Sequence, residues 1–300
     1  MQYYKLYSAD IFNVSRIKTN CLKYLLLILF ILMRIITAAQ PTLYFNGGVG
    51  VMNYGGDLQE KKFTLKECNP SATLGATYYF LPNLLGNFNL TYGKIGATDT
   101  KNGIKWVYRN LNFKSNIFDA AVTAEYDLFD IRDAANPTYL NTQEATIRYT
   151  PYVFAGIAVF NFNPYTYYNG QKIYLPPLKT EAETVPYSLW QLSIPFGIGI
   201  KYALTENIMI AGEMNIRKAF TDYIDDVSKF SYVDTTLLLN TNGQLSASLS
   251  YRADEIPNAH YAFYAERGNP SKQDKYYTFM IKVIFRFGEG TSLFKYGYGN

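Results

Sequence analysis

Residues 190–202, with the sequence WQLSIPFGIGIKY, decide the fold because large apolar side chains alternate with small or polar ones throughout. The apolar set is Trp190, Leu192, Ile194, Phe196, Ile198, Ile200 and Tyr202. The opposite set is Gln191, Ser193, Pro195, Gly197, Gly199 and Lys201. A helix repeats every 3.6 residues and does not produce such alternation. The segment therefore predicts a long β-strand with one apolar face.

The same alternation recurs along the chain. It is strong at residues 118–128, 208–217 and 276–287, and weaker at 42–52, 71–80, 87–96 and 150–162. Together with residues 190–202 these segments make eight predicted strands. Bacterial outer-membrane barrels have an even number of antiparallel strands.

Strand length and loop length favour a membrane barrel. Strands of about 9–11 tilted residues cross a bilayer, whereas strands of globular sheets usually have about five or six residues. The connections alternate, with long ones at 53–70, 97–117, 163–189 and 218–275, short ones at 81–86 and 203–207, and a medium exception at 129–149. The predicted fold is an all-β, eight-stranded antiparallel outer-membrane β-barrel with short periplasmic turns and long outer loops. A soluble β-sandwich, which also alternates, is the alternative.

Pro195 lies inside the clearest strand. Its missing N–H removes one ladder hydrogen bond. The sequence therefore predicts a bulge or a bend at this position.

The first 39 residues resemble a secretory signal peptide. Basic side chains precede an apolar run at residues 24–36, and small residues follow at Thr37, Ala38 and Ala39. An uncleaved membrane helix is the alternative, but the run is shorter than the roughly 20 residues that span a bilayer. The predicted organisation is a signal peptide at 1–39, a barrel at 40–288 and a C-terminal tail at 289–300.

Net charge argues against a nucleic-acid partner. Residues 1–39 hold five of the 28 basic and one of the 24 acidic side chains, which leaves 23 of each in the remainder. A domain without net positive charge lacks the electrostatic footprint of nucleic-acid binding. Cys68 is the single cysteine outside the leader, so no intramolecular disulfide is expected there.

The face opposite the apolar one would fill the barrel interior. An eight-stranded barrel is just wide enough for side chains, and opposite charges in such a space should pair. We therefore predict ion pairs in the lumen and no open pore, with a narrow gated channel as the alternative. The charged residues of this face are Glu125, Asp127, Lys201, Glu213, Arg217, Lys282 and Arg286.

Candidate catalytic and metal-binding parts are few. His260 is the single histidine and no spacing fixes a nucleophile beside it, so an exposed loop histidine is expected. Asp222, Asp225 and Asp226 lack the spacing and central glycine of a known calcium loop. A solvated turn, or pairing with Arg217 or Lys218, is expected for them. We expect no enzyme activity, no cofactor and no metal.

Several stretches resemble a family of small outer-membrane barrels from Bacteroidota that includes the PorG-type component of the type IX secretion system. They are residues 44–57 (YFNGGVGVMNYGGD), 109–113 (RNLNF), 150–160 (TPYVFAGIAVF), 191–197 (QLSIPFG) and 217–228 (RKAFTDYIDDVS). The resemblance implies a non-enzymatic barrel that associates with periplasmic ring lipoproteins of that system. Its most distinctive motif is carried by Thr221, Asp222, Tyr223, Asp225 and Asp226. Either this motif braces the barrel mouth or the inside–outside assignment is reversed, and the first interpretation is simpler.

Two other functions compete with a docking role in the outer membrane. A surface-exposed binding or adhesion barrel would use aromatic loops, whose tyrosines are Tyr165, Tyr167, Tyr168, Tyr174, Tyr251, Tyr261 and Tyr264. A lipid-modifying barrel enzyme would depend on His260.

Overall fold

A computed structural model describes residues 42–59, 64, 66–101, 103–129, 149–204, 208–257 and 265–286. The chain divides into two units, Met1–Thr42 and Leu43–Asn300, and all described residues except Thr42 belong to the second. The predicted signal peptide, the predicted tail at 289–300, His260, Tyr261 and Tyr264 lie outside the described residues. None of the helices that the structure describes is long and apolar enough to span a membrane.

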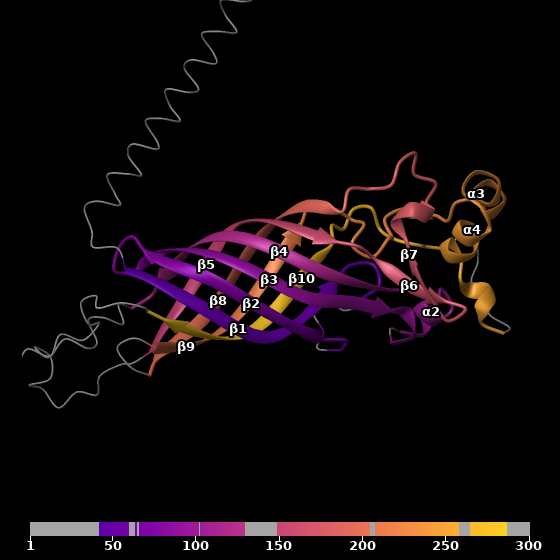
Figure 1. The fold of residues 1–300 in the computed structure, drawn as a ribbon. Coiled ribbons are helices and arrows are strands. Elements are labelled where there is room, and N and C mark those ends of the chain that lie inside the picture. The colour runs from indigo at the N-terminus through magenta and orange to yellow at the C-terminus, as the bar shows by residue number, and fades with distance from the viewer. Residues whose placement is uncertain are drawn as a thin grey trace, which may run out of the picture. The chain divides into compact units, whose positions relative to one another are not determined.

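Eight strands form a closed antiparallel barrel, as the alternation predicts (Figure 1). Each strand pairs with the next barrel strand along the chain, and β10 returns to pair with β1. The pairing of β3 with β4 completes the ring. The barrel strands are β1 (Thr42–Gly55), β2 (Asn69–Tyr79), β3 (Leu84–Thr98), β4 (Asn112–Asp127), β5 (Tyr149–Phe162), β8 (Trp190–Ala203), β9 (Ile208–Ala219) and β10 (Lys275–Phe285).

The long connections gather at one end of the barrel, where they carry the remaining secondary structure (Figure 1). We call the described parts of residues 56–68, 99–111, 163–189 and 220–274 the cap. Its elements are η1 (Asp99–Lys101), α2 (Ile104–Val107), β6 (Tyr165–Tyr168), β7 (Gln171–Tyr174), η4 (Pro176–Leu178), α3 (Thr235–Asn242), α4 (Gln244–Ser250) and η5 (Ala253–Glu255). At the opposite end the structure describes the connection 80–83, residues 128–129 after β4 and residue 204 after β8.

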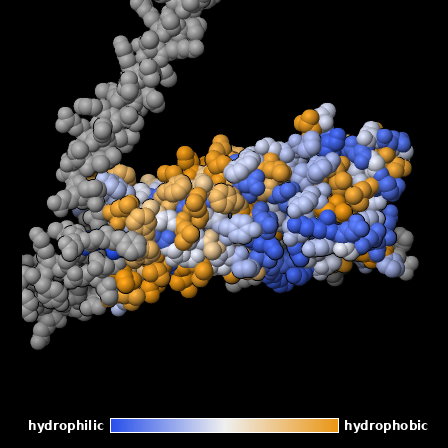
Figure 2. All heavy atoms as spheres, viewed as in Figure 1, coloured by the Kyte–Doolittle hydropathy of each residue, from blue (hydrophilic) through white to orange (hydrophobic). Residues whose placement is uncertain are grey.

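The outward face of the barrel is an exposed apolar belt (Figure 2). Ile157 on β5 is 70% exposed, and every barrel strand contributes exposed large apolar side chains, the least exposed set being that of β9, with Ile208 at 39%. A sandwich would bury this face between two sheets. A belt of this kind around a closed barrel faces lipid hydrocarbon, so the structure excludes the soluble sandwich. Its most exposed members are Val49, Leu74, Tyr92, Val122, Ile157, Trp190, Leu192, Ile198 and Ile281.

β4 begins six residues earlier than its predicted start at residue 118. The prediction missed these residues because the polarity of the two faces inverts along the strand. Near the cap, Lys114 and Asn116 point outward while Phe113 and Ile117 are buried inside. This arrangement is that of a strand in water, with its apolar face inward. The outward face of residues 112–117 therefore lacks the apolar side chains that mark the rest of the strand. The backbone of these residues still pairs with β3 in the same register.

Of the bulge or bend predicted at Pro195, the bulge is wrong. Ala155 lies opposite Phe196 and Ala158 opposite Ser193, so the register between β5 and β8 is the same on both sides of the proline. Pairing with β9 also continues, with Pro195 opposite Arg217. The missing N–H thus interrupts the ladder to β5 without inserting a residue.

The belt gives a first prediction. We expect Ile157→Arg to lower the free energy of unfolding by about 2–4 kcal/mol, because residue 157 lies near the middle of β5 and faces hydrocarbon. Urea unfolding in phospholipid vesicles measures the change. Val185→Arg is the matched control, since Val185 is 71% exposed but lies in the cap. Equal losses for the two variants would contradict a membrane-spanning belt.

Candidate functional site

The lumen near the short-turn end contains a buried three-charge cluster. Lys201 on β8 donates to Glu125 on β4 and to Asp127 Oδ1 at 2.8 Å. Asn87 Nδ2 on β3 donates to Glu125 Oε2 at 2.8 Å. All four side chains are buried, and the single cation contacts both carboxylates.

Two further ion pairs lie between this cluster and the cap. Lys282 Nζ is 2.6 Å from Glu213 Oε2, which also accepts from the Tyr152 hydroxyl at 3.1 Å. Arg217 holds Asp119 with two contacts of 3.1 Å, Nε to Oδ2 and Nη2 to Oδ1. Such bidentate pairs are the strong form of the interaction.

The remaining residue of the predicted lumen set, Arg286, directly follows β10 and is half-buried. The predicted set omits Asp119, although Asp119 is the partner of Arg217. Tyr276 also donates to Asp119 Oδ2, at 2.9 Å. Strand alternation does place Asp119 on the inward face, so the signal was present in the sequence.

These side chains leave little free space in the lumen. A cavity bordered by Thr91, Glu213 and Arg217 has a volume of about 10 Å³, which is room for about one water molecule.

We expect planar-bilayer recordings of the purified protein to show no steady conductance, because the lumen is filled by paired side chains. Protein-free bilayers and a general porin serve as the two controls. A steady conductance comparable with that of the porin would contradict a closed lumen.

At the cap end, the motif carboxyl of Asp225 meets a tyrosine and a second aspartate. The Tyr54 hydroxyl is 2.5 Å from Asp225 Oδ2 and 2.9 Å from Asp274 Oδ1. The other carboxylate oxygens accept from the backbone, Asp225 from Val227 and Asp274 from Ile224. A phenol has one proton to donate, so the second contact requires a protonated carboxyl. Accordingly, burial raises the pKa of Asp225 and Asp274 well above the usual carboxyl range.

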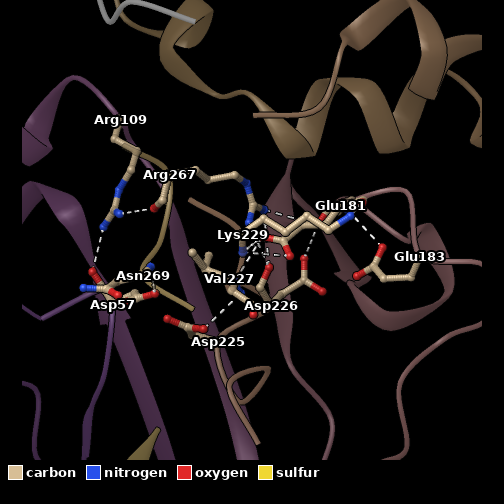
Figure 3. Close-up of polar contacts among 12 residues, drawn as sticks. Asp57, Arg109, Glu181, Glu183, Asp225, Asp226, Val227, Lys229, Arg267 and Asn269 are labelled. Atoms are coloured by element: carbon tan, nitrogen blue, oxygen red, sulfur yellow. Dashed lines mark hydrogen bonds and ion pairs between the residues drawn. The ribbon is translucent and has the colours of Figure 1, made fainter. Parts of the chain in front are cut away.

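Asp226 joins the motif to the loop after β5 (Figure 3). Its carboxylate accepts from Thr180 Oγ1 at 2.6 Å and from the Tyr187 hydroxyl at 2.7 Å. Its carbonyl accepts from Arg267, which also forms an ion pair with the fully buried Glu181. Residues from connections 163–189 and 220–274 are therefore held together by buried polar contacts.

Arg109 joins its own connection to two other parts of the cap (Figure 3). Its Nε and Nη2 hold the two oxygens of Asp99 at 2.7 and 2.6 Å. The guanidinium also donates to the carbonyls of Asp57 and Arg267. The Asp57 carboxylate in turn accepts from the Asn269 amide at 2.6 Å. We call the contacts of Arg109, Arg267 and the motif the mouth brace.

Thr221 and Tyr223 complete the motif. The Thr221 carbonyl accepts from the Asp274 amide at 3.1 Å, and Thr221 Oγ1 accepts from the Tyr223 amide at 3.2 Å. The ring of Tyr223 stacks on Tyr187 with centroids 4.8 Å apart. The motif therefore begins the connection from β9 to β10, and Thr221 lies beside Asp274 at the other end of that connection.

The expectation of a solvated turn, or of pairing with Arg217 or Lys218, is wrong for two of the motif aspartates. Asp225 and Asp226 are only 2% and 3% exposed. Arg217 is turned into the lumen toward Asp119, and Lys218 points outward from β9. Proximity in sequence is misleading here because adjacent strand residues face opposite sides of the sheet.

Several brace residues carry no comparable signal in the sequence. Glu181, Arg267 and Asp274 lie in connections without periodicity, far apart in the chain. Arg109 belongs to a stretch that carries the family resemblance, but the resemblance assigned it no role. Among the described residues, no group of three or more His, Cys, Asp or Glu could hold a metal ion.

The mouth brace should respond to pH. Burial raises the pKa of Asp226 to about 7, with the nearby Arg267 charge opposing part of the rise. Burial also raises the pKa of Asp222 to about 8, and the Asp57 charge adds to the rise. Aspartates of the unfolded chain titrate near pH ~3.9. Between that pH and 7–8, Asp226 and Asp222 are therefore protonated in the folded protein but ionised in the unfolded chain. Their stabilising contribution is therefore full below pH ~4 and is lost as the pH rises through 7–8.

We accordingly expect cap amides to be better protected from hydrogen exchange at pH about 5 than at pH about 8.5, after correction for intrinsic exchange rates. Asp226→Asn should reduce this difference, because an amide does not titrate. Amides of the barrel strands provide the internal control. Cap protection that increases with pH would contradict the assignment.

The aromatic loop residues differ in accessibility. Tyr165 is buried, whereas Tyr167 and Tyr174 are exposed on the hairpin of β6 and β7. Lys172 Nζ lies 3.9 Å from the centre of the Tyr165 ring and 4.7 Å from that of Tyr174. The hairpin therefore presents two tyrosines and a lysine at the cap surface.

The closed barrel, its exposed apolar belt and its ion-paired lumen are the features of an outer-membrane β-barrel. The protein is accordingly located in the outer membrane.

Comparison with known proteins gives one sequence family and several similar structures. Neisserial surface protein A is 9% identical with a TM-score of 0.40, covering 82% of this chain and 97% of that chain. Ail, the attachment invasion locus protein of Yersinia pestis, in complex with the heparin analogue sucrose octasulfate, is 9% identical with a TM-score of 0.38, covering 82% and 99%. OprG from Pseudomonas aeruginosa is 9% identical with a TM-score of 0.35, covering 82% and 95%. No curated protein matches the chain. Residues 22–239 match the domain of unknown function DUF6089, and the chain belongs to that family.

Proposed function

We propose that this protein is a non-enzymatic docking barrel of the outer membrane. The observation that carries the proposal is the lumen filled by ion pairs, which leaves the surfaces at the two ends of the barrel as its working parts. A platform gains affinity when its surface is ordered before binding. The mouth brace supplies such order, because buried contacts of Arg109 and Arg267 hold the long connections together.

The absence of catalytic activity is part of the proposal. The buried carboxylates and cations described above contact one another, hydroxyls or backbone groups, and the cavity that Glu213 and Arg217 border has room for only about one water molecule. Groups neutralised in this way are structural, since a general acid or base must reach a substrate proton. The test is lipid analysis of membranes with and without the protein. A lipid modification that depends on the protein and disappears in His260→Ala would favour the enzyme.

The specific form of the proposal is service to type IX protein secretion, with periplasmic ring lipoproteins as partners. It is supported by the resemblance of residues 217–228 and four other stretches to the family that includes the PorG-type component. In this form the partners would meet the short-turn end, which includes the connection 80–83, and not the cap that the mouth brace orders, because short turns of outer-membrane barrels face the periplasm.

Gene deletion tests this form directly. We expect deletion to reduce export of type IX cargo and the intact protein to co-purify with periplasmic lipoproteins. Complementation with a chain whose β6–β7 hairpin is shortened should restore export, because that hairpin lies at the opposite end from the short turns. Normal cargo export after deletion would overturn the secretion role.

A surface-binding barrel is the second candidate, and the β6–β7 hairpin favours it. Tyr167, Lys172 and Tyr174 are displayed on a paired hairpin, so little entropy is lost on binding. Shortening this hairpin should abolish adhesion to the surface ligand while leaving export intact. Both candidates therefore predict normal export by this variant, and they differ in adhesion, which only the surface-binding barrel predicts to be lost.

A further inference from the structure

Cations follow directly after the apolar belt on the outward face of β3 and β4. Tyr92 lies opposite Phe118, and both side chains are exposed. The next outward pair toward the cap is Lys94 with Asn116, and the pair after that is Gly96 with Lys114. Two residues along a strand span about 7 Å. Aromatic residues mark the membrane interface of such barrels, so these lysines lie at the level of lipid headgroups.

A pocket of about 490 Å³ opens beside these lysines. Pockets for small organic ligands have volumes of roughly 300–1,000 Å³. Gly96 helps to form it, because a Cβ at this position would lie 2.8 Å from the Phe113 carbonyl oxygen. The polar residues that line it include Glu67, Asn69, Lys101, Asn112 and Lys114.

The pocket and its edge carry excess positive charge. Lys101 pairs with Glu67 at 3.0 Å, although its side chain remains 57% exposed. Lys94 and Lys114 are also exposed, and within the described part of the chain neither forms an ion pair with an acid. The carboxylate of Glu67 is therefore outnumbered by three lysines, Lys94, Lys101 and Lys114.

The β6–β7 hairpin extends this surface. Tyr165 pairs with Lys114 across β4 and β6, and Lys114 Nζ lies 5.7 Å from the centre of the Tyr167 ring. Lys172 lies between Tyr165 and Tyr174 on the same hairpin. Amphipathic tyrosine rings are typical of membrane interfaces, where one end is apolar and the other wet.

We propose that Lys94, Lys101 and Lys114 form a rim site for the phosphate groups of an anionic glycolipid of the outer leaflet. Lysine is a compact cation suited to phosphate. The occupant is a lipid headgroup and not a soluble anion, because the belt begins at Tyr92 and Phe118, one outward pair below Lys94. Acyl chains along the belt bring the attached phosphates to the lysines. This site does not depend on the docking function.

The test uses the full chain in neutral detergent, titrated with diphosphorylated lipid A and followed by native mass spectrometry. The triple variant Lys94→Gln, Lys101→Gln and Lys114→Gln should bind this probe about tenfold more weakly, from three partly screened charge contacts. The charge-matched control replaces Lys218, Lys272 and Lys275 with Gln. It removes the same charge around β9 and β10 and should bind within twofold or so of the wild type.

Two further binding measurements distinguish a lipid phosphate from free inorganic phosphate as the ligand. Lipid A without phosphates should bind the wild-type protein as weakly as the triple variant binds the intact probe. Inorganic phosphate at millimolar concentration should not displace the intact probe. Unchanged affinity of the triple variant, an equal loss in the control, or displacement by inorganic phosphate would each overturn the site. Circular dichroism verifies the folding of both variants, which the exposed Lys94, Lys101 and Lys114 should not affect.

Discussion

Replacing Lys201 with methionine is expected to lower the free energy of unfolding by about 3–5 kcal/mol, because it leaves two buried carboxylates without their cation. Lys201 is 2% exposed and contacts both Glu125 and Asp127. Methionine fills a similar volume, so the variant mainly tests loss of charge and not loss of packing. The barrel interior offers these carboxylates no alternative cation at hydrogen-bond distance among the described residues.

Urea unfolding of the protein in phospholipid vesicles measures this loss. The compensating variant adds Glu125→Gln and Asp127→Asn to Lys201→Met, and so removes all three charges. It should recover most of the lost stability, since replacing a whole buried ion cluster is often nearly neutral. Asn87 keeps a hydrogen-bond acceptor in this variant, because the glutamine introduced by Glu125→Gln retains a side-chain carbonyl oxygen. Equal stability of Lys201→Met and the wild type would show that the cluster does not hold the lumen.

The second large effect is expected at Arg267. Arg267→Met should destabilise the cap locally by about 3–5 kcal/mol, because Glu181 is fully buried and loses its cation. The same change removes donors from the Asp226 carbonyl and from Thr180 Oγ1. The barrel strands should remain folded, since their ladder does not include this residue.

Hydrogen exchange separates these two regions. Residues 163–189 and 220–257 should lose protection in Arg267→Met, whereas β3, β4 and β5 should not. Adding Glu181→Gln removes the buried charge but keeps an acceptor for the amides of Ser228 and Lys229. This double variant should recover part of the protection. A uniform loss over cap and barrel would contradict a brace that is confined to the mouth.

Alternation in the sequence predicted the eight strands and the inward direction of residues such as Lys201 and Glu125. This succeeds because side chains of a strand alternate between its two faces, which is a local rule that each segment obeys by itself. The rule fails where the environment changes along one strand. At Lys114 and Asn116 the outward face leaves lipid for water, so the start of β4 shows no apolar alternation on that face.

Partner choice within the lumen needed the tertiary structure. Lys201 lies on β8 and Glu125 on β4, with β5 between them. Whether two such side chains meet depends on the register of two successive strand pairs, and the sequence of neither strand fixes that register. The same reason explains Arg217, whose partner Asp119 is 98 residues away, while the nearby motif aspartates face the cap.

The sequence by itself determined the barrel, its strand number and the membership of its lumen, because all three follow from a period of two residues. The tertiary structure alone decided the mouth brace, in which Arg267 reaches Glu181 and Arg109 reaches Asp57. These residues lie in long connections without periodicity. Their contacts form only after the closed barrel has brought the ends of its strands together, so no local pattern in the chain records them.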